Sequence, residues 1–85
     1  RETITLAHSY AYISAIEDAA PDEDGVAHLD HDTVMSGQTL AAALQAAGAV
    51  CRAVDDVAAG KYTRAFCAVR PPGHHALPDK PMGFC

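Results

Sequence analysis

Two consecutive histidines, His74 and His75, are the side chains of this sequence most suited to chemistry. They follow Pro71-Pro72-Gly73, where two prolines fix the backbone and withdraw amide donors while the glycine permits angles that other residues resist. In an irregular loop both imidazoles can reach one cavity, where they suit proton transfer near neutral pH. They could equally be metal ligands, although consecutive residues are an awkward chelate for one ion.

The competing interpretation of an isolated histidine pair is an ordinary surface loop. Three neighbouring features favour the catalytic one: the rigid Pro-Pro-Gly platform, the apolar run at residues 65–69 before it, and Gly83-Phe84 shortly after it. A short continuous apolar run is typical of a strand that is buried on both faces, as in a parallel sheet. The histidines would then follow the carboxyl end of a strand, where open α/β sheets bind ligands.

Two helices are expected before this strand. Residues 9–20 have apolar side chains at helical spacing, with Ser9 as the N-cap and Pro21 closing the helix. Residues 39–59 carry a wide apolar face and small residues that allow close packing, and Gly60 suits the left-handed position after the C-terminus. Residues 26–38, with alternating Asp and His, are expected to form a loop.

Composition excludes several classes. The chain has 85 residues, a net charge of −5 and no basic cluster, so direct binding to nucleic acid is not expected. It has no apolar run of the roughly 20 residues that cross a bilayer, and no signal-peptide pattern. Its three cysteines lack metal-type spacing, which favours reduced thiols in a cytoplasmic protein. With few large apolar anchors, the chain is expected to belong to something larger or to be marginally stable alone.

One family resemblance covers nearly the whole chain. Residues 70–76, RPPGHHA, and residues 82–85, MGFC, resemble the paired signature of class II histone deacetylases and their bacterial relatives, which include acetylpolyamine amidohydrolases. Three upstream segments are also similar to that family: residues 29–33 ending in Asp-Thr, the small-residue segment 46–49, and His8-Ser9 with Tyr12-Ile13.

The resemblance implies a fold and a set of roles. Residues 1–85 would be the N-terminal part of a deacetylase catalytic domain with the three-layer α/β/α arginase/deacetylase fold, a mainly parallel sheet, and one or two short strands in this piece. His75 would be the main general base and acid, with His74 assisting electrostatically. Asp32 would accept hydrogen bonds from substrate amides at the rim, while Gly83 and Phe84 would line an acyl-lysine tunnel.

The resemblance also implies a zinc cofactor, with potassium as a second candidate ion. In the family, two aspartates and a histidine bind zinc in motifs that lie after the GFC segment, so no metal ligand is expected within this chain. The residues Asp30, His31 and Asp32, with His28, could be proposed as substitutes, but a flexible acidic turn is the favoured interpretation. The isolated piece is therefore expected to be inactive.

The expected substrate of the parent enzyme is an N-acetyl-lysine of histones or other proteins, with acetylpolyamine as the alternative. A different class stays open: a non-catalytic binding or structural module that packs with a partner chain through its alanine-rich helix. No membrane partner is expected, and the oligomeric state is not indicated by the sequence. The expected location is cytoplasmic for a bacterial source, with the nucleus open for a eukaryotic one.

Overall fold

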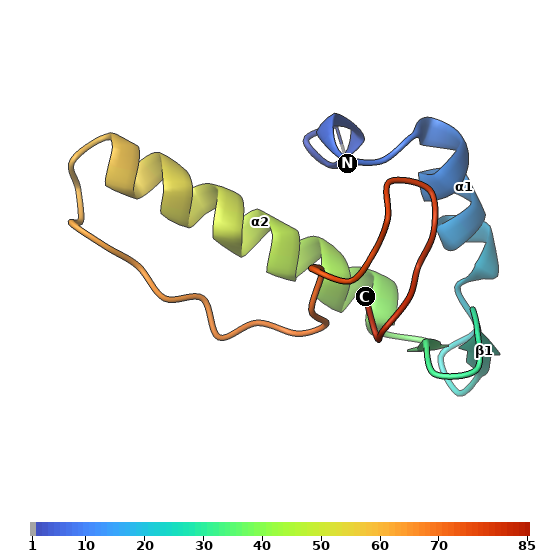
Figure 1. Ribbon diagram of the computed structural model, residues 1–85. Coiled ribbons are helices and arrows are strands. Elements are labelled where there is room, and N and C mark those ends of the chain that lie inside the picture. Colours follow the sequence, from blue (N-terminus) through green and yellow to red (C-terminus); the bar gives the residue numbers. More distant parts are fainter. Residues whose placement is uncertain (1) are drawn as a thin grey trace.

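Two α-helices, one 3-10 helix and one short hairpin make up the regular structure of residues 2–85, the part of the chain that this computed structural model describes (Figure 1). In chain order the elements are a 3-10 helix at Ile4–Leu6, α1 at Tyr10–Ala19, β1 at Val26–His28, β2 at Val34–Ser36 and α2 at Thr39–Ala58. The remaining residues, from 59 onward, run as irregular backbone and tight turns that return to the N-terminal part of α2.

Helix α1 confirms the helix expected at residues 9–20. The Ser9 side-chain oxygen accepts a hydrogen bond from the Tyr12 backbone N–H at 3.2 Å, as an N-cap does. The helix stops before Pro21, whose ring cannot continue the intrahelical hydrogen bonds. Ile13 is the buried residue of α1 and anchors it to the rest of the chain.

Substituting the cap serine is expected to weaken this corner of the fold. In Ser9→Ala, the helix loses its cap and the hydroxyl that donates to Asp79, so unfolding should become easier by about 1 kcal/mol. Thermal unfolding of the full-length protein measures the effect. Ser14→Ala is the matched control, because Ser14 is exposed in the middle of the same helix. Equal melting temperatures for the two variants would contradict the capping role.

The β1–β2 hairpin corrects the expectation of a loop at residues 26–38. The two strands pair antiparallel with Val26 opposite Ser36, Ala27 opposite Met35 and His28 opposite Val34. Met35 is only 3% exposed, whereas both outer valines face solvent, so one face of the hairpin is buried. Strands of three residues are too short to show a period in the sequence, and the Asp and His residues between them obscure it further.

Helix α2 confirms the second expected helix. Its first residue, Thr39, accepts the Ser36 backbone N–H through its hydroxyl at 2.8 Å, and Gly60 adopts the left-handed backbone with φ +77° just after its end. Ala46 is the only buried residue of α2, and it joins Ile13 and Met35 in a small apolar core. The rest of its apolar face stays largely exposed in the described part of the chain, including Val54 at 61%.

The apolar run at residues 65–69 does not form the expected buried strand. It runs back beside α2 as irregular backbone, and Phe66 is 92% exposed (Figure 1). Its contact with α2 is a weak hydrogen bond from the Cys67 thiol to the Ala49 carbonyl at 3.9 Å. An extended segment becomes a strand only where a neighbour satisfies its amides, and within residues 2–85 no strand pairs with this one.

The described sheet is consequently the two-stranded antiparallel hairpin, not a mainly parallel sheet. The two short strands agree with the one or two strands expected in this piece, although they lie elsewhere in the sequence. Among the described residues, no helix combines the length and the apolar character that crossing a bilayer requires.

Candidate active site

Two tight turns follow the histidine pair and hold it in place. In the turn at residues 77–80, the Leu77 N–H donates to the Lys80 carbonyl at 2.9 Å. This turn is fastened to the start of α1, because His8 Nδ1 lies 2.9 Å from the Pro78 carbonyl and the Ser9 hydroxyl donates to Asp79 at 2.5 Å. His8 and Ser9 therefore support the loop that carries the pair.

The second turn, at residues 82–85, is closed at both ends. The Met82 N–H donates to the Cys85 carbonyl at 3.1 Å, and the Cys85 N–H donates to the Met82 carbonyl at 3.0 Å. Between them Gly83 and Phe84 both have positive φ, at +58° and +66°. A non-glycine residue in this region is uncommon, so the conformation of Phe84 is held by its surroundings.

The 82–85 turn packs directly against His75. The His75 backbone N–H donates to the Cys85 sulfur at 3.3 Å. A Cβ on Gly83 would lie 2.9 Å from the His75 Cβ and 3.0 Å from its Cγ, closer than real side-chain atoms approach. The absence of a side chain at position 83 is thus what makes room for the imidazole.

The histidine pair is divided between two environments. The imidazoles of His74 and His75 meet edge to face, with ring centroids 4.3 Å apart and planes at 69°. Only His75 lines an open hollow on the surface. The hollow is lined by Asp30, His31, Asp32, His75, Lys80, Met82 and Gly83.

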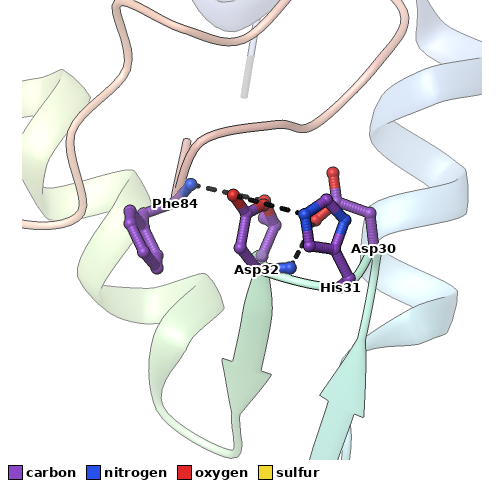
Figure 2. A network of polar contacts seen from close by, with 5 residues as sticks. Asp30, His31, Asp32 and Phe84 are labelled. Carbon is purple, nitrogen blue, oxygen red and sulfur yellow. Dashed lines mark hydrogen bonds and ion pairs between the residues drawn. The ribbon is translucent and has the colours of Figure 1, made fainter.

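Three of the five site residues expected from the sequence therefore meet in one place: Asp32, His75 and Gly83. Phe84 does not join them, because its 61% exposed ring points away from the aspartates (Figure 2) and lies beside a second hollow with Arg70 and Pro71. Lys80 and Thr33 were missed by sequence reasoning. Lys80 lines the hollow, and Thr33, although polar, is only 4% exposed and donates its hydroxyl to the lining residue Asp32.

The acidic side of the hollow is a hydrogen-bonded turn. The Asp32 backbone N–H donates to an Asp30 carboxylate oxygen at 3.0 Å (Figure 2). His31 Nε2 lies 3.9 Å from the Oδ2 atom of the Asp32 carboxylate. The donated N–H is the main cause that holds the pKa of Asp30 below its ordinary value of 3.8. The resulting stabilisation is present above the unfolded-state pKa and disappears as the pH falls through the lowered folded value.

Asp30, His31 and Asp32 are also the one group of three candidate metal ligands within residues 2–85, with their ligand atoms inside 4.8 Å of one another. The arrangement does not fit a zinc site. The His31 side chain is 93% exposed, whereas zinc-binding imidazoles are oriented by a second partner. This turn therefore supplies a polar rim to the hollow.

The chain is similar to known proteins of one family. The family model of the histone deacetylase domain matches residues 1–85. Type-2 histone deacetylase 2 of Dictyostelium discoideum is 48% identical over 86% of this chain and 4% of its own length. Histone deacetylase 10, chloroplastic, of Oryza sativa is 38% identical over 99% of this chain and 21% of its own length. The histone deacetylase-like amidohydrolase of Pseudomonas aeruginosa is 38% identical over 93% of this chain and 20% of its own length.

The chain belongs to the histone deacetylase family. Family membership implies the arginase/deacetylase fold, of which the two helices and the hairpin are a small piece. The chain spans between 4% and 21% of the length of these three relatives.

Proposed function

We propose that residues 1–85 are the N-terminal part of a catalytic domain that removes acetyl groups from N-acetyl-lysine of histones or other proteins. The observation that carries this proposal is the placement of His75 in one hollow with Asp32 and Gly83, in a chain of the histone deacetylase family. A titratable imidazole facing a polar rim is what acid–base cleavage of an amide requires.

Each expected role has a physical basis in the site. His75 takes a proton from the attacking water and delivers it to the leaving amine, since an amine departs only when protonated. His74, whose ring meets that of His75 edge to face, adjusts the local electrostatics. Asp32, with a side chain that is 45% exposed at the rim, is available to accept hydrogen bonds from backbone amides of a peptide.

Gly83 and Phe84 are proposed to line the channel for the acyl-lysine stem. The position of Gly83 supports this proposal, because it borders the hollow beside His75. The Phe84 ring lies outside the hollow in the structure, so its role requires the ring to turn toward the substrate. Zinc is proposed as the cofactor of the full-length enzyme, where it would polarise the amide carbonyl from ligands outside these residues.

An acetylpolyamine is the second candidate substrate. The aspartates Asp30 and Asp32 give the rim of the hollow a negative edge, which attracts a cationic chain as well as it binds a peptide backbone. The two substrates can be separated by comparing kcat/KM for an acetyl-lysine peptide and for an acetylated polyamine. A preference in kcat/KM of more than about tenfold for either compound would assign the substrate class.

The test of the function uses the full-length protein, purified and incubated with zinc and an acetyl-lysine peptide. Release of acetate that stops on chelation and resumes when zinc is restored is the expected result. A folded, zinc-loaded protein that releases no acetate from either substrate would contradict the proposal and favour a binding or structural module.

The 85-residue piece alone is expected to show no turnover under the same conditions. The zinc ligands are proposed to lie outside these residues, and without the metal an amide carbonyl is not activated. Mass spectrometry of the peptide after prolonged incubation measures this. Hydrolysis that is lost in His75→Ala would show the expectation to be wrong.

A further inference from the structure

Thr33 is the one buried polar residue of the described chain, at 4% exposure. Its backbone carbonyl accepts the N–H groups of Leu29 and Asp30, at 2.8 and 3.3 Å, and so closes the loop at residues 29–33. These two bonds use the backbone alone and would form with any residue at this position. They leave the hydroxyl free for other partners.

The Thr33 hydroxyl joins two segments that are 51 residues apart in sequence. It accepts the Phe84 backbone N–H at 3.3 Å and donates to an Asp32 carboxylate oxygen at 3.3 Å. Phe84 belongs to the 82–85 turn, and Asp32 is the rim residue of the hollow. One buried hydroxyl thus connects the turn and the rim.

The same turn contacts His75 on its other side. The Cys85 sulfur accepts the His75 N–H, and Gly83 packs against the His75 side chain. A continuous series of contacts therefore runs from the Asp32 carboxylate through Thr33 and the 82–85 turn to the imidazole. A shift of the 82–85 turn away from Thr33 would change the distance between the His75 imidazole and the Asp32 carboxylate.

We propose that Thr33 is a positioning residue, whose hydroxyl sets Asp32 and His75 at the separation that the reaction requires. The inference rests on the proposed deacetylase function. Removing the hydroxyl leaves the Phe84 N–H without this partner and frees the Asp32 carboxylate to rotate. The first change loosens the 82–85 turn that packs against His75, and the second moves Asp32.

The test is Thr33→Val in the full-length enzyme, assayed with zinc and an acetyl-lysine peptide. Valine keeps the shape and removes the hydroxyl. Because Asp32 moves, KM should rise, and because His75 moves, kcat should fall. The ratio kcat/KM should be reduced about tenfold or more. Thr33→Ser restores the hydroxyl and should recover most of the loss. Thr63→Val, at an exposed position after α2, is the control and should behave as the unsubstituted enzyme.

A purely structural role for Thr33 predicts a different pattern. Partial unfolding lowers the active fraction, so apparent kcat falls while KM stays constant and the melting temperature drops. That pattern, or unchanged kinetics in Thr33→Val, would overturn the proposal. An unsubstituted enzyme without deacetylase activity would instead refute the proposed function. Where Thr33→Val does not fold, Thr33→Cys replaces it, because a thiol is a weak hydrogen-bonding group of similar size; an unchanged KM there also overturns the proposal.

Discussion

Replacing His75 with alanine is expected to lower kcat of the full-length enzyme about a hundredfold to ten-thousandfold, the usual contribution of a positioned general base and acid. His75 is the member of the pair that lines the hollow with Asp32 and Gly83, so under the proposed function its imidazole exchanges protons with the bound substrate. KM should change little, because proton transfer develops in the transition state rather than in substrate binding.

Two comparisons make this expectation specific. His74→Ala should cost less than His75→Ala, because His74 contacts the hollow only through the ring of its neighbour. His28→Ala removes an exposed imidazole from β1 and should leave kcat unchanged. A larger loss for His74→Ala than for His75→Ala would reverse the assignment of the two roles. Steady-state kinetics on the acetyl-lysine peptide measures all three.

The second large effect is expected from Gly83→Ala. At φ +58° an L-residue costs about 1–2 kcal/mol, and the added Cβ would also lie 2.9 Å from the His75 Cβ. His75 or the whole 82–85 turn must then shift. Since a misplacement of about 1 Å can cost a hundredfold in rate, kcat should fall by about that factor while the protein loses some stability.

Gly60→Ala separates the two causes. Gly60 has φ +77°, but a Cβ there would meet no heavy atom within 4 Å. The backbone penalty is thus matched, whereas the collision with the histidine is present only in Gly83→Ala. Both variants should lower the melting temperature, and only Gly83→Ala should lower kcat. Equal kinetics in the two variants would show that position 83 does not control His75.

The helices could be predicted from the sequence because their signals are local. The Ser9 cap acts on a residue three positions away, and the apolar stripe of residues 39–59 repeats within a single helix. Gly60 marks the end of α2 through its own backbone preference. Such signals need no knowledge of the rest of the fold.

The strands could not be predicted in the same way. The run at residues 65–69 has the composition of a buried strand, but a strand depends on a neighbour that hydrogen-bonds to it, and no described segment pairs with it. Phe66 therefore remains 92% exposed. The hairpin shows the converse: β1 and β2 pair although their sequence resembles a polar loop, because burial of Met35 against the core selects the register.

The sequence by itself determined the family and the chemical types at the site. Two segments were enough for both: Arg70 to Ala76, with its two imidazoles, and residues 82–85. A motif of adjacent residues can be recognised from the sequence without knowledge of the fold. The tertiary structure decided which histidine lines the hollow and that the Phe84 ring lies outside it. It also decided that the Thr33 hydroxyl joins Asp32 to the 82–85 turn. Thr33 and Phe84 are 51 positions apart, and only the closure of the chain between them brings the hydroxyl to the amide.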